Sequence, residues 1–253
     1  MGLDTDTTPP VFLVDALPTG SRALLDGDEA RHAATVRRMR PGERLTLADG
    51  AGSAVGCVIE TVHPGRDASL ELTVESRWSE PPARPRVIIA QALAKGDRGE
   101  LAVELATEAG ADAILPWRAA RSVARWDDGA RGAKALARWQ TTVRAAAKQA
   151  RRATVPPVLT PVDTAGLCET AEKSALALVL DGTAPRRLTE VDLPTDGDLL
   201  LVVGPEGGIT DAEAEALTNA GALPVRLGPT VLRTSTAAVV ALGALGALTS
   251  RWT

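Results

Sequence analysis

Residues 199–213, LLLVVGPEGGITDAE, join an apolar strand, a glycine-rich turn and the start of a helix. The apolar residues predict a buried strand over 198–203. The spacing of Thr210 and Glu213 forms a capping box, which predicts a helix over 211–220. In α/β folds, turns at the carboxyl ends of parallel strands lie at the edge where ligands bind. The segment therefore predicts an α/β domain with a candidate ligand site at residues 204–208, GPEGG.

The composition of this turn limits the ligands that it can bind. Its glycines allow close approach of the backbone, and the following helix presents free N–H groups. The turn lacks G-x-G-x-x-G and the chain lacks G-x-x-x-x-G-K-[ST], which argues against a nicotinamide dehydrogenase and a P-loop protein. The Glu206 carboxylate would repel a pyrophosphate but tolerates a cationic centre, such as the sulfonium of S-adenosylmethionine. The alternative is a strand-to-helix connection without a ligand.

A second turn, residues 227–234 with the sequence LGPTVLRT, follows a predicted strand over 224–227. Its glycine and proline favour a loop before a terminal helix that starts near Ser235, and Thr234 or Ser235 is expected to cap that helix. Arg233 precedes a helix N-terminus, where a cation is unfavourable, so it calls for an anionic partner. That partner is either Glu206 or another acid in a salt bridge, or a phosphate or carboxylate of a ligand.

The rest of the C-terminal part alternates between strand and helix patterns. Strands are expected over 86–93, 112–117 and 175–180, and helices over about 97–110 and 131–151. Asp97 and Glu100 stand at the positions of a capping box for the first of these helices. Apolar strands that alternate with helices predict a buried parallel sheet.

The N-terminal part is different, because it is rich in short strand patterns. Turn-bounded apolar runs predict a small β-barrel with one helix over 28–39, and the strands are expected at 11–14, 22–25, 43–47, 54–59 and 69–74. Three prolines within residues 79–85 cannot occupy a helix interior or a central strand, so they predict a linker. We expect an N-terminal domain over 1–78 and an α/β domain over 79–253.

Charge is unevenly distributed along the chain. The formal net charge is −4, yet residues 118–152 contain ten Lys or Arg against two acids. A second basic cluster in the N-terminal part consists of Arg31, Arg37, Arg38, Arg40 and Arg44. Each cluster alone is explained equally well as a solvated surface, but two in an acidic protein favour a polyanionic partner such as RNA.

The two cysteines, Cys57 and Cys168, are far apart and lack a CxxC spacing. This argues against a disulfide framework and against a zinc site, so no metal is expected and a reducing, cytoplasmic location fits. No stretch resembles a membrane span, and the alanine-rich residues 236–248 are interrupted by two glycines. We therefore expect no membrane association.

Several further motifs accompany the two turns. They are QALAKGDR at 91–98, ELATEAG at 104–110, RSV at 121–123, AAKQARR at 146–152, RH at 31–32, VRRMRPGE at 36–43 and DG at 49–50. Together they resemble the bacterial RsmE family of the SPOUT superfamily over nearly the whole chain. That family methylates N3 of uridine 1498 in 16S ribosomal RNA with S-adenosylmethionine. The resemblance implies a PUA-like barrel, a SPOUT domain with a deep trefoil knot, which is a rare topology, and a homodimer with the cofactor pocket beside its interface.

The resemblance also implies which residues form the sites. The expected cofactor-binding residues are Leu180, Gly204, Pro205, Glu206, Gly207, Leu227, Gly228, Leu232, Arg233 and Thr234. The expected RNA-binding residues are Arg31, His32, Arg37, Arg38, Arg40, Arg121, Lys148, Arg151 and Arg152. The chain departs from the family at Ser235, where the family often has Glu, and at Ala150, where it often has Ser, so neither side chain can be indispensable in an active enzyme.

Methylation of uracil N3 requires loss of its proton, so a base or an anion-stabilising cation is expected. Arg233 is the candidate cation, and Glu206 is the nearest acid within the motifs. The N3 atom lies on the Watson–Crick edge, so the base must be unpaired or flipped. Two alternatives stay open: methylation of another RNA atom, such as a ribose 2′-OH, and a non-catalytic RNA-binding assembly factor with the same fold.

Overall fold

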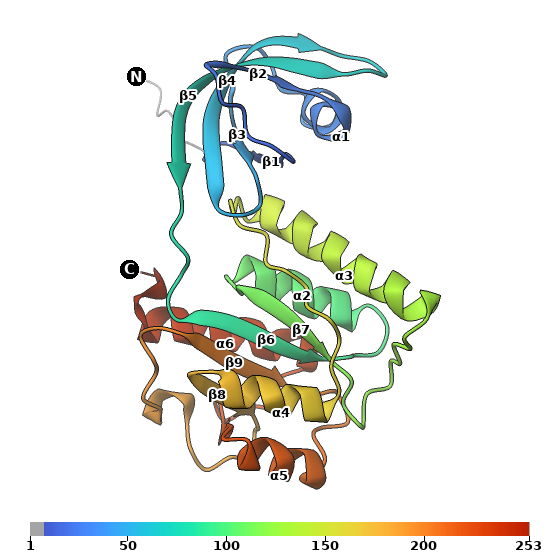
Figure 1. The fold of residues 1–253 in the computed structure, drawn as a ribbon, viewed down its shortest axis with the longest axis vertical. Coiled ribbons are helices and arrows are strands. Elements are labelled where there is room, and N and C mark those ends of the chain that lie inside the picture. Colours follow the sequence, from blue (N-terminus) through green and yellow to red (C-terminus); the bar gives the residue numbers. More distant parts are fainter. Residues whose placement is uncertain (1–7, 253) are drawn as a thin grey trace. The chain divides into compact units, whose positions relative to one another are not determined.

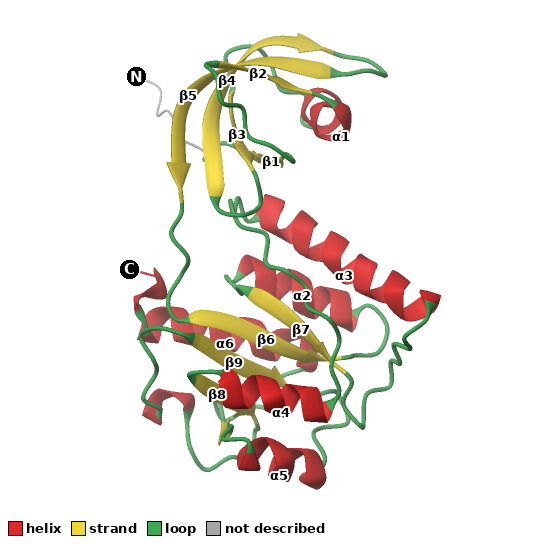
Figure 2. Ribbon diagram, viewed as in Figure 1, coloured by secondary structure: helices red, strands yellow, loops and turns green. Residues whose placement is uncertain are grey.

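The computed structural model describes residues 8–252 of the chain (Figures 1 and 2). The chain forms two compact units. The first extends to Pro81 and also takes in Ala147–Val155, and the second contains Pro82–Ala146 and the chain from Pro156 onward. The boundary near Pro81 falls in the proline-rich segment. Residues 147–155 belong to the first unit, whereas the expected division between residues 78 and 79 puts them in the second domain.

The first unit is built on a five-stranded sheet with the order β1-β3-β4-β5-β2. β1 pairs with β3 in parallel, and the other neighbours are antiparallel. Apolar side chains such as Phe12, Leu45 and Leu70 are buried together in its core. The strands are β1 (Val11–Leu13), β2 (Arg22–Leu25), β3 (Arg44–Ala48), β4 (Ser53–His63) and β5 (Ser69–Ser79).

Backbone hydrogen bonds attach residues 153–155 to the turn between β3 and β4. Val155 N donates to Gly50 O at 2.8 Å, and Gly52 N donates to Ala153 O at 3.3 Å. Gly52 has φ +107°, and a Cβ there would lie 3.3 Å from both Glu80 O and Thr154 Oγ1. A glycine is therefore required for this close approach, which explains why the segment belongs to the first unit.

The helix expected over 28–39 is shorter and irregular. α1 (Gly27–Arg31) passes directly into η1 (His32–Val36), a π-helical turn, and Arg38 has φ +56°. Ala30 and Ala33 are fully buried against the sheet, and Met39 is nearly so. The irregular turn thus lets both the helix and Met39 contact one core, which a continuous helix pattern does not predict.

The second unit contains a parallel sheet with the order β10-β8-β9-β6-β7. This confirms the predicted parallel sheet, and none of its five strands contains an exposed residue. The strands are β6 (Arg86–Ala92), β7 (Ala113–Trp117), β8 (Leu176–Leu180), β9 (Asp198–Val203) and β10 (Leu223–Val225). β9 has the predicted bounds, whereas β10 ends two residues before the expected Leu227.

Helices cover both faces of this sheet (Figure 2). α2 (Arg98–Glu108) and α6 (Thr234–Leu248) pack against each other on one face. α4 (Thr164–Lys173) and α5 (Asp211–Asn219) share a core with the opposite face, through Leu167 and Leu217. α3 (Ala130–Gln149) runs beside α2 (Figure 1), and the short helices η2 (Leu188–Glu190) and η3 (Ser250–Trp252) complete the fold. Among the described residues, no helix is both long and apolar enough to cross a membrane.

Three helix predictions need correction. α4 was not predicted, although Asp163 caps it by accepting a hydrogen bond from Gly166 N at 3.0 Å, because the glycine in its first turn weakens the helix pattern. α3 ends at Gln149, and Arg151 has φ +56°. Asp97 precedes α2 but makes no side-chain capping bond, so the expected capping box with Glu100 is not formed.

The connection from β8 to β9 lies against the segment that follows β10. Leu188 N donates to Arg226 O, and Arg226 N donates to Arg186 O, both at 3.0 Å. Asp181 N also donates to Val225 O at 2.9 Å. These bonds bring the Leu180 region and the second turn together.

Candidate cofactor site

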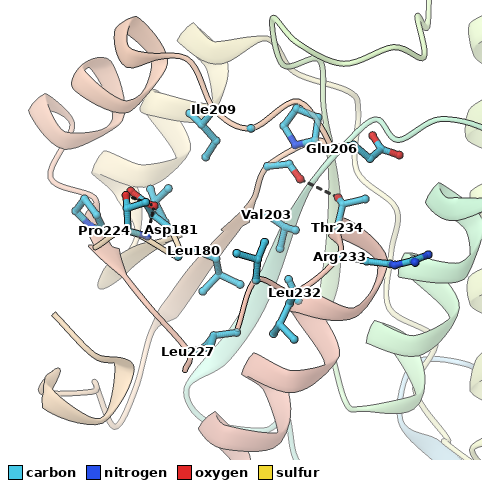
Figure 3. Close-up of a pocket in the computed structure, with 18 of the residues that line it drawn as sticks. Leu180, Asp181, Val203, Glu206, Ile209, Pro224, Leu227, Leu232, Arg233 and Thr234 are labelled. Carbon is cyan, nitrogen blue, oxygen red and sulfur yellow. Dashed lines mark hydrogen bonds between the residues drawn. The ribbon is translucent and has the colours of Figure 1, made fainter. Parts of the chain in front are cut away.

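A cavity of about 650 Å³ lies at the carboxyl ends of the parallel strands of the second unit (Figure 3). The turns after β8, β9 and β10 form its walls, because parallel strands end at the same sheet edge. Nine of the ten residues predicted to bind the cofactor line it, namely Leu180, Gly204, Pro205, Glu206, Leu227, Gly228, Leu232, Arg233 and Thr234. The structure thus brings together two turns that residues 209–226 separate in the sequence.

The turn after β9 is held by the predicted capping box. Thr210 N donates to the Glu213 carboxylate at 2.9 Å, and Glu213 N donates to Thr210 Oγ1 at 3.2 Å. Gly208 has φ +74°, a conformation that glycine adopts without strain. Gly207 is the predicted cofactor residue that does not line the cavity: its carbonyl accepts a hydrogen bond from Arg121 Nη1 at 3.1 Å.

The second turn differs from the prediction at the start of α6. Neither Thr234 nor Ser235 caps this helix, because the residue at the N-cap position is Arg233. The Arg233 side chain makes no capping hydrogen bond either. The Thr234 hydroxyl instead donates to Gly204 O at 2.8 Å and accepts from Gln91 Nε2 at 2.9 Å. Gln91 and Thr234 are 1% and 6% exposed. This buried relay connects the ends of β6 and β9 to the start of α6 and so holds both turns in place.

Glu206 and Arg233 do not form the salt bridge that was considered. The Glu206 carboxylate accepts from Lys95 N at 3.2 Å and from Arg98 Nη1 at 3.4 Å. The Arg233 side chain makes no hydrogen bond or ion pair within residues 8–252, and it points away from Leu180 and Leu227 in Figure 3. An unpaired cation beside a helix N-terminus keeps the prediction of an anionic ligand open.

The sequence prediction missed the turn after β8. Asp181, Gly182 and Thr183 line the cavity, and the Asp181 carboxylate accepts from Thr183 N at 2.8 Å and from Thr183 Oγ1 at 2.7 Å. The signal was present, because an acid and a glycine directly follow an apolar strand. The carboxylate offers the cavity a further acceptor for hydroxyl groups or a neighbour for a cation.

Glu213 links this site to the loop after β7. Its carboxylate also accepts from Ala120 N at 2.8 Å and from Thr164 Oγ1 at 3.2 Å. Burial raises the pKa of the Glu213 carboxyl, but the hydrogen bonds from Thr210, Ala120 and Thr164 outweigh burial and hold its pKa below the ordinary value. Since Ala120 precedes Arg121, the ionised carboxylate also holds the segment that contacts Gly207.

Replacement of Glu213 by Gln is expected to lower the free energy of unfolding by about 1–3 kcal/mol at neutral pH, because charge-assisted bonds to a buried group are lost. A carboxyl whose pKa is lower in the folded state stabilises the protein above its unfolded pKa, and that stabilisation is lost as the pH falls through the folded value. The difference between wild type and Glu213→Gln should therefore shrink below the ordinary pKa of 4.5. Urea unfolding at several pH values measures it, with exposed Glu215→Gln as the control. An equal difference at every pH would contradict the role of the carboxylate.

The predicted RNA-binding residues divide between the two units. Arg121 is in the second unit, whereas Lys148, Arg151 and Arg152 fall in the segment that joins the first. These three residues therefore belong to the same unit as the N-terminal basic cluster. Arg37, Arg38 and Arg40 of that cluster are exposed. His32 is partly buried and lies edge-on to the Phe12 ring, with ring centroids 6.0 Å apart.

Two of the predicted RNA-binding residues, Lys148 and Arg31, have acidic partners within the first unit. Lys148 Nζ donates to Glu29 at 2.7 Å, both side chains are about one-fifth exposed, and Lys148 lies 5.9 Å from the centre of the Phe12 ring. Arg31 pairs with Asp28 at 3.0 Å on the surface. The surroundings of Lys148 indicate that it attaches α1 to the end of α3. Within residues 8–252, no His, Cys, Asp and Glu side chains cluster in a way that could hold a metal ion.

Comparisons with known proteins identify the family. An RNA methyltransferase domain matches residues 81–246, and an RNA methyltransferase PUA domain matches residues 25–67. The chain is 56% identical to Ribosomal RNA small subunit methyltransferase E of Mycobacterium tuberculosis over 96% of this chain and 93% of that protein.

Several solved structures are similar over almost their whole length, and two of them contain the cofactor. One is a Ribosomal RNA small subunit methyltransferase E from Neisseria gonorrhoeae bound to S-adenosyl methionine, with TM-score 0.81, 29% identity and coverage of 95% of this chain and 98% of that chain. The other is the methyltransferase Lpg2936 from Legionella pneumophila in complex with the same cofactor, with TM-score 0.81, 29% identity and coverage of 96% and 98%. These likenesses confirm a PUA-like domain followed by a SPOUT methyltransferase domain. The chain belongs to the RsmE family of RNA methyltransferases.

Proposed function

We propose that this chain transfers the methyl group of S-adenosylmethionine to N3 of uridine 1498 in 16S ribosomal RNA of the small subunit. The observation that carries the proposal is the cavity between the turns after β8, β9 and β10. The relatives of this chain are named Ribosomal RNA small subunit methyltransferase E, and one of them was solved with S-adenosyl methionine bound. No metal enters the proposed reaction.

The donor set of the cavity fits the proposed cofactor. Leu180, Leu227 and Leu232 supply apolar walls, and Asp181 and Glu206 supply carboxylates, which suit hydroxyl groups and a cationic centre. Pro205 has no N–H to donate, and the carbonyl of Gly204 already accepts a hydrogen bond from Thr234, so neither of these two groups is available to the ligand. The bound cofactor would supply an electrophilic methyl group, and the protein would supply orientation and exclusion of water.

The arrangement of charges assigns different roles to the two candidate catalytic residues. Glu206 is occupied by Lys95 N and Arg98, so we propose that it holds residues 95–98 beside the cofactor and does not act as the base. Arg233 has no acidic partner within residues 8–252, so it is suited to stabilise the negative charge that develops on the uracil, or to bind a phosphate. We therefore propose Arg233, and not Glu206, as the residue that assists loss of the N3 proton.

The basic residues supply the proposed RNA contacts. In the first unit these are Arg31, His32, Arg37, Arg38, Arg40, Arg151 and Arg152, and in the second Arg121. Contacts from Lys and Arg to phosphates hold RNA with little sequence preference, so the choice of uridine depends on the site at the sheet edge. We propose Lys148 as a structural residue in place of an RNA contact, because Glu29 already neutralises it. A ribosomal substrate places the proposed reaction in the cytoplasm.

Mass spectrometry of nucleosides tests the reaction. Small subunits from a strain that lacks 3-methyluridine are incubated with the purified chain and S-adenosylmethionine, and then digested. The appearance of 3-methyluridine is the expected result. A 2′-O-methylated nucleoside would favour the alternative enzyme, and cofactor binding without any methylated product would count against both.

The surface of α6 supports the proposal of a homodimer. This helix has no charged residue, and its Val240 and Leu248 are each 46% exposed, while Val231 in the preceding turn is 91% exposed. Exposed apolar surface of this kind is typical of an interface between subunits. The cavity shares Val231 and Ala237 with this region, so it would lie beside the interface.

Val240→Glu is expected to convert the dimer into a monomer, because it places a charge within the proposed apolar interface. Sedimentation velocity at micromolar protein concentration measures the change. Leu24→Glu, at an exposed apolar position of the first unit, is the matched control and should leave the sedimentation coefficient unchanged. A wild-type protein that sediments as a monomer would contradict the dimer.

A further inference from the structure

Arg98, the first residue of α2, lines the cofactor cavity although it lies outside both predicted turns. Among the described residues, the basic ones that line this cavity are Arg98 and Arg233. The acids that line it are Asp181, Glu206 and Asp211. A second guanidinium therefore belongs to the cofactor cavity, beside that of Arg233.

The neighbours of Arg98 in the sequence face a different cavity, of about 250 Å³. Asp97 and Gly99 line it, together with the edge-to-face rings of Trp126 and Trp139. The two cavities share no lining residue. The loop that leads into α2 thus contributes one side chain, that of Arg98, to the cofactor cavity.

α2 and α6 begin at the same edge of the sheet. α2 follows β6 and α6 follows the turn after β10, and the carboxyl ends of parallel strands meet at one edge. The two helices also pack against each other. Arg98 at the first position of α2 and Arg233 at the N-cap of α6 therefore lie near each other beside the cavity.

Neither arginine is favourable for the stability of its helix. A helix N-terminus carries a partial positive charge, so a cation there is unfavourable. Arg98 has one ion pair within residues 8–252, a 3.4 Å contact with Glu206, and its side chain is 50% exposed. The Arg233 side chain has no hydrogen bond or ion pair in the same range. Two cations at two helix N-termini thus call for an anion in addition to Glu206.

Glu206 and Arg233 lie on the same side of the cavity. Thr234 Oγ1 donates to Gly204 O at 2.8 Å, Arg233 directly precedes Thr234, and Glu206 is two residues after Gly204. Figure 3 shows both charged side chains on this side, across from Asp181. Because Arg98 contacts Glu206, this side carries two guanidinium groups and one carboxylate, which leaves a net positive charge.

A uracil that has lost its N3 proton suits a site with two guanidinium groups. The negative charge then spreads over O2, N3 and O4, so the two carbonyl oxygens beside N3 become stronger acceptors. Guanidinium groups are donors that stay protonated in proteins. Hydrogen bonds to O2 and O4 leave the N3 electron pair free to react. Cytosine presents an amino donor in place of O4 and would meet a cation there.

We infer that Arg98 is a second catalytic cation, which together with Arg233 donates to the carbonyl oxygens of the target uracil and holds it as the N3 anion. This inference rests on the proposed function. The N3–H bond breaks and its proton passes to water. The freed N3 electron pair forms the bond to the methyl carbon, and the carbon–sulfur bond breaks with its electrons going to sulfur. Both arginines stay protonated, and Glu206 is the positioning residue that holds Arg98.

The kinetic test uses the full chain, S-adenosylmethionine and unmodified small subunits. Arg98→Gln should lower kcat by about 10- to 100-fold at neutral pH, as expected for the loss of a cation beside a developing negative charge. A higher pH should partly restore its rate, because N3 then loses its proton without the second cation. Arg98→Lys keeps the charge and should retain most of the rate. Cofactor affinity should not fall in either variant, because Lys95 N still holds Glu206.

Arg86→Gln is the matched control. Arg86 pairs with Asp198 at the same distance of 3.4 Å and its side chain is 43% exposed, but it starts β6 and so lies at the opposite edge of the sheet. This variant should keep the wild-type kcat. The inference is overturned if Arg98→Gln keeps its kcat, if no pH restores the lost rate, or if cofactor affinity falls equally. A higher KM with unchanged kcat would assign Arg98 to a phosphate and would also overturn it.

Fluorine NMR separates this inference from the proposed function, because it needs no turnover. An RNA fragment with 5-fluorouridine at the target position is bound to the protein with S-adenosylhomocysteine, which has no methyl group to transfer, and the fluorine resonance is followed as the pH rises. Loss of the N3 proton should have its midpoint about one pH unit or more lower with the wild type than with Arg98→Gln. Equal midpoints overturn the inference and leave the proposed function standing if 3-methyluridine is formed. Unequal midpoints without 3-methyluridine support the role of Arg98 and count against the proposed function alone.

Discussion

Gly204→Val is expected to abolish measurable binding of S-adenosylmethionine. A Cβ at this position would lie 2.8 Å from Ile209 Cγ1, closer than side chains tolerate, and Ile209 itself lines the cofactor cavity. Because overpacking of this kind costs about 1–3 kcal/mol before any added methyl groups enter the ligand volume, we expect an affinity loss of at least about 100-fold. Isothermal titration calorimetry measures the loss directly.

A pair of smaller changes tests whether this contact is the cause. Gly204→Ala adds only the Cβ and should weaken binding less than Gly204→Val. Ile209→Ala removes the atoms nearest to that Cβ. Gly204→Ala should therefore cost less cofactor affinity in the Ile209→Ala background than in the wild-type protein.

The Gly204→Val variant should still bind RNA through the first unit, because Gly204 belongs to the second unit. Retained cofactor affinity in Gly204→Val would show that the cavity is misassigned.

Thr234→Val is expected to lower both stability and cofactor affinity, although the two side chains have nearly the same shape. The hydroxyl is the middle member of the relay from Gln91 through Thr234 to Gly204 O, and its loss removes both bonds at once. Gln91 is almost completely buried, and its Oε1 already has no partner among the described residues, so water does not readily replace the lost bond. Since an unsatisfied buried group costs about 1–3 kcal/mol, we expect a loss of about 2–4 kcal/mol in unfolding free energy.

Thr234→Ser is the matched control, because it keeps the hydroxyl and removes only a methyl group. It should retain most of the cofactor affinity, whereas Thr234→Val should lose about tenfold or more as the two turns separate. Urea unfolding and calorimetry on the same samples measure the two effects. Equal behaviour of the Ser and Val variants would show that the methyl group, and not the hydrogen-bond relay, is what matters at this position.

The two turns illustrate which parts of the site can be predicted from the sequence. The β9 strand and the Thr210–Glu213 capping box were predicted with the correct bounds, because neighbouring residues determine both. The second turn was placed correctly, but the role of Thr234 was wrong. A threonine before a helix is a common cap, and only the proximity of Gly204 and Gln91 gives its hydroxyl better partners.

The basic residues show the same limit. Their clustering along the sequence indicated a polyanionic partner, yet it did not distinguish exposed arginines from Lys148, whose ammonium group is held by Glu29. These two residues are 119 positions apart. A charge count cannot detect such a pair, because the partner comes from another segment of the fold.

The sequence by itself determined the alternation of strands and helices, the two glycine-containing turns and the family to which the chain belongs. These features depend on short-range patterns of apolar residues, caps and glycines, which act within a few residues. The tertiary structure alone decided which side chains meet. It paired Glu206 with Arg98, connected Thr234 to Gly204 and assembled Asp97, Trp126 and Trp139 around a second cavity. These three contacts join segments that are distant in the sequence, so local patterns of residues do not reveal them.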